Sequence, residues 1–407
     1  MVGDVSFEVE IEKLVYGGRG LGRWNGRVVL APFVVPGERA TVEPERESAG
    51  LINARTVRGE QPDPTRALPA CPYFFHCGGC HYQHLTYERQ LDAKRAILLE
   101  TLARLGRLTW DQPVEVVAAE PWGYRNRTQL HLRKRGGRCD IGYFEHGSHR
   151  LYPIDSCPIS SPALNRAIAT LARLGRDRRF PDFLHGVELF TNERDLLLTV
   201  VDTERPIGKR FFEWCAGEME GLCTAPYLDY AAGPDLFRVG SRSFFQVNRF
   251  LAARLPEVAL EGRSGEVALD LYAVVGLFSL PLARRFARVV ALDAGRSAVE
   301  DLTVNAGRAG LALEIHHGTA DRFLETFADP VDLVLADPPR AGLGPAVTKS
   351  LIRLRPRRLT LVSCDPATLA RDLQALVAGG FQILAIKIVD LFPQTFHIES
   401  VVELQSG

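Results

Sequence analysis

The chain has 407 residues, and its 49 Lys and Arg balance its 49 Asp and Glu. A hydrophobic share of 46% excludes a mainly disordered or fibrous protein and predicts two or three globular domains. No run approaches about 18 apolar residues, and the N-terminus is acidic where a secretory signal is basic. We therefore expect no membrane span, no export and a cytoplasmic location, while the neutral charge balance neither favours nor excludes nucleic acid as a partner.

The first part of the chain reads as a small all-β unit over residues 2–58. VSFEVEIEKL alternates polar and apolar residues, GGRGLGRWNGR is a glycine-rich turn region, and VVLAPFVV and RATVEPE are further strand candidates. A polar, proline-rich stretch at 58–70 predicts a linker. Residues 87–105 then have the apolar spacing of a helix and contain no Gly or Pro.

The remainder divides at about residue 265. Residues 113–235 mix short strand signals, TQLHLRKR and LLLTVVD, with one helix near ALNRAIATLARL. After 265, five short apolar runs alternate with helical segments: VALDLY, VVALD, VDLVLAD, LTLVSC and ILAIKIVDLF. Continuous apolar strands between helices predict an α/β fold with a parallel sheet that is covered on both faces.

Three cysteines lie within ten residues in CPYFFHCGGCHYQH, as Cys71-x5-Cys77-x2-Cys80. Three thiolates so close in sequence can surround one metal centre, and Cys157 in IDSCP is the candidate for a fourth ligand. A set of four cysteines suits structural zinc or an iron–sulfur cluster, and His76 and His81 are further possible zinc ligands. The residues alone leave both metals open, beside the plain alternative of reduced core cysteines.

The run VALDLYAVVGLFSLPLA resembles the strand, tight turn and helix start of a nucleotide site. About 20 residues further on, VVALD ends in Asp293, which is placed to bind a ribose hydroxyl. Only Gly276 remains of the glycines expected in such a loop, so an ordinary strand-to-helix turn is an equal alternative.

ADPPRAGL follows the apolar strand VDLVL, and its two prolines make a stiff turn. This turn puts Asp337 at the carboxyl edge of the sheet, where ligands bind in such folds. A simple strand terminator is the alternative.

LVSCDPATLARDL places Cys364 between a strand and a helix. A thiolate near a helix N-terminus is stabilised by the helix dipole, which predicts a reactive nucleophile, although cysteine is also a common buried residue. Glu399, in FPQTFHIESVVELQ, is a candidate general base at the start of the last strand. A solvated Glu399 and a merely packed His397 are the alternatives.

Taken together, these motifs resemble the RNA uracil-5-methyltransferases, S-adenosylmethionine-dependent enzymes that make 5-methyluridine. Nearly the whole chain takes part, with VYGGRGLGR, the cysteine string, GYRNRTQLHL, GSHRLYPIDSCP, GSRSFFQVN, LDLYAVVG, DPPRAGL, SCDPATLARD and FPQTFHIES in order. The likeness is to the branch with an N-terminal TRAM domain and a four-iron cluster, which methylates 23S ribosomal RNA.

The resemblance implies a role for each matching residue. Cys71, Cys77, Cys80 and Cys157 would ligate a 4Fe–4S cluster that shapes the RNA-binding domain. The methyl donor S-adenosylmethionine would contact Gln246, Tyr272, Asp293 and Asp337. Cys364 would be the nucleophile that adds to carbon 6 of the base, and Glu399 the base that removes the carbon 5 proton.

The resemblance also implies three domains. Residues 1–60 would be a TRAM-like barrel that binds RNA, 61–235 a central α+β RNA-binding domain with the cluster, and 236–407 a Rossmann-like catalytic domain. A helix near 84–106 would pack on the catalytic domain. The candidates for phosphate contacts in the central domain are Arg125, Arg127, Arg133, Arg135 and Arg138, for which a solvated charged face is the alternative.

Two positions depart from the family pattern. Val274 replaces a glycine of the donor loop, which predicts altered backbone dihedrals or crowding of the donor, and Asp293 replaces a longer Glu. The leading hypothesis is methylation of 23S rRNA by a monomer, and the runner-up is the same reaction on the T-loop uridine of tRNA. An RNA-binding ribosome-assembly factor without turnover is the alternative from another class, while the cysteine spacing disfavours a radical or redox enzyme.

Overall fold

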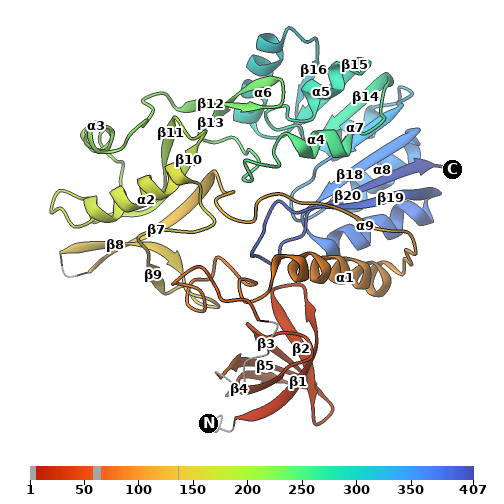
Figure 1. The fold of residues 1–407 in the computed structure, drawn as a ribbon. Coiled ribbons are helices and arrows are strands. Elements are labelled where there is room, and N and C mark those ends of the chain that lie inside the picture. The colour runs from red at the N-terminus through yellow and green to blue at the C-terminus, as the bar shows by residue number, and fades with distance from the viewer. Residues whose placement is uncertain (1–5, 58–65, 136) are drawn as a thin grey trace. The chain divides into compact units, whose positions relative to one another are not determined.

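The computed structural model describes residues 6–57, 66–135 and 137–407, and the chain in it divides into two compact units (Figure 1). Unit 1 comprises the chain up to Leu98 together with Tyr143–Ile154 and Phe392–His397. Unit 2 comprises Leu99–Gly142, Asp155–Leu391 and Ile398–Gly407. Most of the expected linker, 58–65, lies outside the described residues, as do residues 1–5.

Unit 1 begins with a closed five-stranded barrel, as the alternating sequence predicts. Its strands follow the order β1-β2-β3-β5-β4 and are β1 Phe7–Val15, β2 Arg19–Trp24, β3 Arg27–Pro32, β4 Arg39–Ser48 and β5 Leu51–Thr56. The alternating residues Val9, Ile11, Val29 and Val42 are buried inside it. Asn25 and Gly26 join β2 to β3 with positive φ angles of 48° and 76°, which is the backbone of a type I′ hairpin turn.

The rest of unit 1 holds the cysteine-rich segment and a piece of chain from far along the sequence. Helix α1, Tyr87–Gly106, confirms the predicted helix, and its residues up to Leu98 belong to this unit. Gln90 and Gln394 bind each other twice, through Gln90 Nε2 to Gln394 Oε1 and Gln394 N–H to Gln90 Oε1, both at 2.9 Å. Lys94 Nζ donates to the carbonyl of Phe392 at 2.9 Å. The segment Phe392–His397 is therefore anchored in unit 1, although the residues directly before and after it in the sequence belong to unit 2.

A five-stranded antiparallel sheet has the strand order β11-β10-β7-β8-β9. Most of it belongs to unit 2, whereas the last residues of β8 and all of β9, Leu151–Pro153, are assigned to unit 1. The strands are β7 Arg127–Arg135, β8 Arg138–Phe144, β10 Leu184–Thr191 and β11 Leu196–Thr203. Helix α2, Pro162–Leu174, is capped by Ser161 and buries its apolar face. A helix α3, Lys209–Glu218, and a hairpin of β12, Tyr227–Ala232, with β13, Asp235–Gly240, follow.

The second sheet of unit 2 has eight strands in the order β16-β15-β14-β17-β18-β20-β19-β6. Its strands are β14 Gly265–Leu271, β15 Phe286–Asp293, β16 Glu314–His317, β17 Leu333–Ala336, β18 Arg358–Ser363, β19 Phe381–Val389, β20 Ser400–Ser406 and β6 Glu115–Val117. The accompanying helices are α4 Arg254–Ala259, α5 Ser279–Ala283, α6 Arg296–Ala309, α7 Ala320–Thr326, α8 Gly344–Leu354 and α9 Pro366–Ala378. All four residues of β17 are buried, as expected for a central strand that is covered on both faces.

The five apolar runs in the sequence correctly locate β14, β15, β17, β18 and β19. The expected parallel sheet is found from β16 to β18, whereas β20 runs antiparallel to both β18 and β19. The β19–β20 connection is short enough to return without a crossover helix, so the two strands pair as antiparallel neighbours. Of the helices in the described ranges, none is both long and apolar enough to cross a membrane.

Candidate active site

Five of the residues singled out in the sequence lie at the edge of the large sheet that is formed by the carboxyl ends of its parallel strands. They end, follow or precede five adjacent strands. Asp293 ends β15, Tyr272 follows β14, Asp337 follows β17, Cys364 follows β18 and Glu399 precedes β20. These strands are consecutive in the sheet, and β20 begins at the edge where the parallel strands end. The five residues therefore lie at the same end of neighbouring strands.

Two register pairs fix this arrangement locally. Leu271 pairs with Ala336, so Tyr272 and Asp337 leave neighbouring strands together, and Asp337 N–H donates to Leu271 O at 3.4 Å. Ser363 pairs with Ser400, so Cys364 and Glu399 are the next residues beyond one cross-strand pair.

The loop after β14 has an unusual backbone. Tyr272 and Val274 have positive φ angles of 67° and 49°, and Gly276 has 96°. A β-branched residue in this region is strained, and Val274 is held there by its N–H, which donates to Asp293 Oδ2 at 2.9 Å. Its side chain packs against an apolar cluster that includes Phe237 and Phe245. Val274 therefore adopts a glycine-like φ while its side chain is accommodated by the core.

Asp293 connects this loop to the start of α6, because its second oxygen, Oδ1, accepts the N–H of Gly295 at 2.7 Å. The residue also lines a cavity of about 270 Å³, which we call the Tyr272–Asp293 pocket. Its lining consists of Tyr272, Leu292, Asp293, Ala294, Gly318, Thr319, Ala320, Asp321, Leu343, Gly344, Pro345, Ala346 and Val347. The pocket combines an apolar wall with two carboxylates and two hydroxyl groups, a lining that suits the heterocycle and ribose of a nucleoside.

The pocket contains residues that the sequence reading missed. Thr319 and Asp321 follow β16, a short and largely exposed strand without an apolar run, so no strand signal pointed to this loop. Gln246 and Asp337 are not among the described residues that line the pocket. Gln246 is buried, and its carbonyl accepts the side-chain amide of Asn126 at 3.0 Å.

Asp270, also missed, is a fully buried carboxyl group next to this edge. Ser279 Oγ donates to its Oδ2, whereas its Oδ1 is buried without a hydrogen-bond partner. Burial raises the pKa of Asp270 to about 8, with help from the charges of Asp337 and Asp293 and against the Ser279 hydrogen bond. Asp270 is therefore a buried carboxyl group with one satisfied and one unsatisfied oxygen.

The second part of the edge is the Cys364 cluster, which we define as Asp337, Cys364 and Glu399. Burial raises the pKa of Asp337 to about 7 and that of Glu399 well above its usual value, to which the charge of Asp337 adds. Burial also raises the pKa of Cys364 to about 12, and the charges of Glu399 and Asp337 act in the same direction. Burial thus disfavours the ionised form of all three groups, and the charge of Asp337 adds to this effect at Cys364 and Glu399.

The sequence predicts that the helix dipole stabilises a Cys364 thiolate, whereas burial and the neighbouring acids raise the pKa of this thiol in the structure. Helix α9 is capped by Asp365, whose Oδ1 accepts the N–H groups of Ala367 at 3.0 Å and Thr368 at 2.9 Å. The donors at the helix start are thus satisfied by a carboxylate, and the half-buried sulfur lies beside two further acids.

The cysteine-rich segment with Cys71, Cys77 and Cys80 lies in unit 1 and consists mainly of turns, and Cys77 forms an isolated β-bridge with Glu145. Cys77 Sγ accepts the N–H of Gly79 at 3.4 Å, and a Cβ on Gly78 would lie 3.0 Å from Phe144 O. Amide donors to sulfur and close backbone packing fit a set of thiolates around an iron–sulfur cluster. Among the residues that the structure describes, no three His, Cys, Asp or Glu side chains already form a group that could hold a metal ion.

The fourth candidate ligand, Cys157, belongs to unit 2. Asn165 binds its backbone on both sides, because Oδ1 accepts the Cys157 N–H at 2.7 Å and Nδ2 donates to the Cys157 carbonyl at 3.0 Å. The turn that carries Cys157 is therefore fixed within its own unit.

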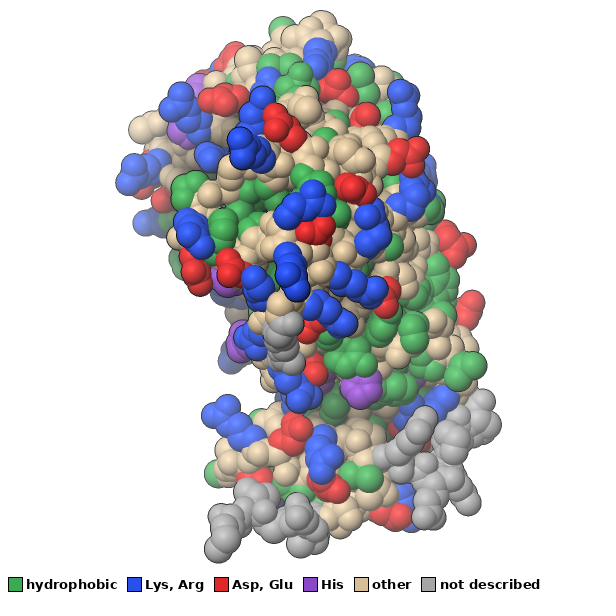
Figure 2. All heavy atoms as spheres, turned by 90° about the vertical axis from the view of Figure 1, so that its left-hand side faces the viewer, with side chains coloured by type: hydrophobic (Ala, Val, Ile, Leu, Met, Phe, Trp, Pro, Cys, Tyr) green, Lys and Arg blue, Asp and Glu red, His purple; other side chains and the backbone are tan. Residues whose placement is uncertain are grey.

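The five candidate phosphate-binding arginines have different environments. Arg127 is buried, donates to Ser243 O at 2.7 Å and pairs with Glu188 at 2.7 Å, so its expected phosphate contact is wrong. Arg133 and Arg138 are exposed, and Arg138 pairs with Asp140 at 3.1 Å. Arg125 is half-buried, and the side chain of Arg135 lies outside the described residues. Figure 2 shows many Lys and Arg side chains on one face of the molecule, with Asp and Glu among them.

Comparison with known proteins gives a consistent picture. The family model described as tRNA (Uracil-5-)-methyltransferase matches residues 319–406. The chain is 32% identical to an uncharacterized RNA methyltransferase of Thermosynechococcus vestitus, over 99% of this chain and 98% of the relative. It is 33% identical to the 23S rRNA (uracil(1939)-C(5))-methyltransferase RlmD of Alkalilimnicola ehrlichii, over 98% and 96% of the two chains.

The chain belongs to the RNA uracil-5-methyltransferase family. It is therefore an S-adenosylmethionine-dependent methyltransferase. Its fold matches the crystal structure of the Pyrococcus abyssi tRNA (uracil-54, C5)-methyltransferase in complex with S-adenosyl-L-homocysteine. The TM-score is 0.75 at 24% identity, over 97% of this chain and 100% of that one. The α/β methyltransferase fold and the N-terminal barrel predicted from the sequence are confirmed.

Proposed function

We propose that this family member methylates carbon 5 of a specific uridine in 23S rRNA. The observation that carries the proposal is the placement of Asp293, Tyr272, Asp337, Cys364 and Glu399 on five adjacent strands at one sheet edge. This placement puts a nucleoside-sized pocket beside a thiol and two carboxyl groups of raised pKa. The similarity to a 23S rRNA methyltransferase over nearly the whole chain supports rRNA as the substrate.

The residues at the edge fit the methyl donor of the family. Tyr272 and Asp293 would hold its nucleoside part in the pocket, and Asp293 accepts hydrogen bonds as a ribose-binding carboxylate does. Gln246 and Asp337 would complete the donor contacts. When bound, S-adenosylmethionine supplies an electrophilic methyl group and a positive charge.

Cys364 and Glu399 would carry the chemistry of the base. Carbon 5 of uracil is a weak nucleophile, and addition of the Cys364 sulfur to carbon 6 makes carbon 5 nucleophilic. Once carbon 5 carries the methyl group, Glu399, when ionised, would take the proton from carbon 5, and the bond from sulfur to carbon 6 would then break to release Cys364. The target base must leave its stack to reach a half-buried thiol, so a loop uridine is the expected substrate.

Unit 1 and the central sheet would bind the RNA. The barrel Phe7–Thr56 would act as a TRAM domain, and Cys71, Cys77, Cys80 and Cys157 would hold a structural 4Fe–4S cluster. Exposed arginines such as Arg133 would contact phosphates. Iron content and visible absorbance of anaerobically purified protein would test the cluster, and both should fall in a Cys77→Ser variant.

A second substrate has an observation in its favour. The family model that matches residues 319–406 is described by its activity on tRNA. The same reaction on the T-loop uridine of tRNA is therefore the second candidate, with the same roles for Cys364 and Glu399.

The test is transfer of labelled methyl from S-adenosylmethionine by anaerobically purified protein. Unmodified 23S rRNA and unmodified tRNA are offered separately, with Cys364→Ala as the control. We expect 5-methyluridine in rRNA alone and none with the variant. Label in tRNA alone would retain the mechanism and overturn the substrate, and label in neither would favour an RNA-binding assembly factor.

A further inference from the structure

Five consecutive residues form one side of the Tyr272–Asp293 pocket, which we call the Leu343 wall. They are Leu343, Gly344, Pro345, Ala346 and Val347. These residues end the loop that follows Asp337 and begin helix α8. Leu343 and Val347 are buried, so the wall is part of the packed fold as well as of the pocket. The position of the wall depends on the contacts that hold this loop.

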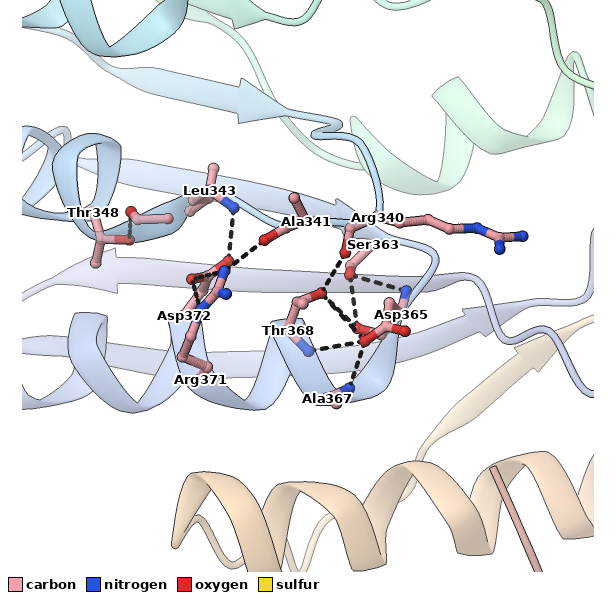
Figure 3. Close-up of polar contacts among 11 residues, drawn as sticks. Arg340, Ala341, Leu343, Thr348, Ser363, Asp365, Ala367, Thr368, Arg371 and Asp372 are labelled. Carbon is pink, nitrogen blue, oxygen red and sulfur yellow. Dashed lines mark hydrogen bonds and ion pairs between the residues drawn. The ribbon is translucent and has the colours of Figure 1, made fainter. Parts of the chain in front are cut away.

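One face of helix α9 holds the loop (Figure 3). Thr368 Oγ1 donates to the carbonyl of Arg340 at 3.1 Å. Four residues further along the helix, Asp372 Oδ2 accepts the N–H of Leu343 at 2.7 Å. Residues four apart lie on the same face of a helix, so both contacts connect the loop to the same side of α9.

Asp372 is buried, and both of its carboxylate oxygens have partners. Its Oδ1 accepts from Arg371 Nε at 3.0 Å and from Arg371 Nη2 at 2.9 Å. The same Nη2 donates to the carbonyl of Ala341 at 2.7 Å. The guanidinium supplies the opposite charge that a buried carboxylate requires. Arg371 and Asp372 together therefore bind a carbonyl and an N–H group of the loop.

Gly342 allows the loop to approach these two side chains closely. It has a φ of 75°, which favours glycine. A Cβ at this position would lie 2.7 Å from Arg371 Nη2 and closer still to Asp372 Oδ2. A larger residue would push the loop away from α9, so the backbone of the loop is fitted to this pair of side chains.

Helix α9 also leads back to the Cys364 cluster. Asp365 caps the helix, which runs from Pro366 to Ala378, and Cys364 directly precedes this cap. Asp372 lies about two turns from the start of the helix. The proposed nucleophile and the Leu343 wall are therefore both attached to one short, regular helix.

We propose that Asp372 is a positioning residue, which fixes the Leu343 wall to the helix that begins at Cys364 and so sets the separation of the methyl donor from the nucleophile. This inference rests on the proposed function. In that reaction the sulfur and the donor methyl group meet neighbouring carbons of one base. A misplacement of about 1 Å can lower such a rate about 10²-fold, so this buried contact affects the rate as well as the stability.

The first experiment measures the Kd for S-adenosylhomocysteine by calorimetric titration of the full-length protein without RNA. Asp372→Ala removes the acceptor of the Leu343 N–H and should weaken binding about three- to tenfold. Asp372→Asn keeps one oxygen for this N–H and should lose less. Unchanged affinity in Asp372→Ala would overturn the proposal.

The matched control is Asp235→Ala. Asp235 is also a buried carboxylate of unit 2 that pairs with an arginine, Arg284, and it does not line the pocket. Its loss should lower the melting temperature and leave the Kd for S-adenosylhomocysteine unchanged. Equal losses of affinity in Asp235→Ala and Asp372→Ala would assign the effect to general destabilisation and overturn the proposal.

A second pair of variants changes the loop instead of the helix. Gly342 and Gly310 have similar φ angles, 75° and 65°, so alanine causes similar backbone strain at both. A Cβ on Gly310, at the end of α6, would meet no other part of the described chain within 4 Å. Gly342→Ala should therefore weaken S-adenosylhomocysteine binding, whereas Gly310→Ala should lower only the melting temperature. The same Kd in both variants would overturn the proposal.

A third experiment separates position from affinity by single-turnover methylation of unmodified 23S rRNA. At saturating S-adenosylmethionine the rate of Asp372→Ala should remain about three- to tenfold below that of the parent, because the donor is bound but misplaced. Return of the rate to the parent value at saturation would mean an effect on affinity alone and would overturn the proposal. If the parent methylates neither rRNA nor tRNA, the proposed function fails, whereas the titrations still test the role of Asp372 at the pocket.

Discussion

The Tyr272–Asp293 pocket and the Cys364 cluster lie at the same sheet edge and are held by different means. In the pocket, Asp293 binds the backbone N–H groups of Val274 and Gly295, so its geometry is fixed before any ligand arrives. In the cluster, burial raises the pKa of Asp337, Cys364 and Glu399, and the charge of Asp337 raises that of the other two further. The proposed donor side of the site thus depends on fixed backbone hydrogen bonds, whereas the proposed catalytic side depends on the protonation of its buried acids.

The largest effect is expected from Glu399→Gln, which removes the base and keeps the shape of the side chain. Multiple turnover should fall about 10²- to 10⁴-fold, because the carbon 5 proton is no longer taken. A methylated RNA that stays bound through Cys364 should accumulate and be visible as a slow band on a denaturing gel. Turnover within threefold of the parent would show that another group is the base.

A smaller effect is expected at the donor side. Asp293→Ala removes the acceptor of two backbone N–H groups and should weaken S-adenosylhomocysteine binding about 10- to 100-fold in a calorimetric titration. The matched control is Asp332→Ala, because Asp332 also accepts two backbone N–H groups, those of Glu266 and Val267 at the start of β14. Equal losses in both variants would assign the effect to general loosening of the sheet.

The buried Asp270 gives a prediction about stability and pH. Its folded-state pKa of about 8 exceeds the usual value near 3.9 in an unfolded chain, so the folded protein binds more protons between these values. The resulting stability is fully present below about pH 4 and is lost as the pH rises through 8. Asp270→Asn should therefore raise the melting temperature by several degrees more at pH 9 than at pH 5.

The exposed Asp111→Asn serves as the control for this pH series. A difference between Asp270→Asn and the parent that is the same at both pH values would contradict a buried, protonated Asp270.

The smallest effect is expected from Val274→Gly. The substitution relieves strain of about 1–3 kcal/mol at a positive φ, but it loses side-chain packing and adds the backbone entropy of glycine. The opposing changes should leave the free energy of unfolding within about 1 kcal/mol of the parent in urea titrations. A donor affinity more than tenfold higher would show that Val274 obstructs the pocket, as its position in the family pattern suggests.

Much of the catalytic sheet could be predicted, because buried central strands are continuous apolar runs, as in VALDL and VDLVLA. The edge strand β16, EIHH, has no such run, so the loop with Thr319 and Asp321 was not recognised. The altered pKa of Cys364 depends on Glu399, which is distant in sequence and comes close only through the antiparallel β20. Arg127 looked like a surface cation, yet its burial depends on Ser243 and Glu188. The local sequence pattern predicts which strands are buried. The charges around a side chain depend on residues that only the folded chain brings together.

The segment Phe392–His397 has a consequence for how this protein can be divided. It belongs to unit 1 through Gln394, which binds Gln90, yet it joins β19 to β20 and ends two residues before Glu399. A truncation that removes the first 98 residues would take away the hydrogen-bond partners of Gln394 and leave its polar groups exposed within the connection to the proposed base. Unit 1 is therefore not a module that can be exchanged by itself. Substituting it between relatives should succeed only when the six-residue insert is exchanged with it.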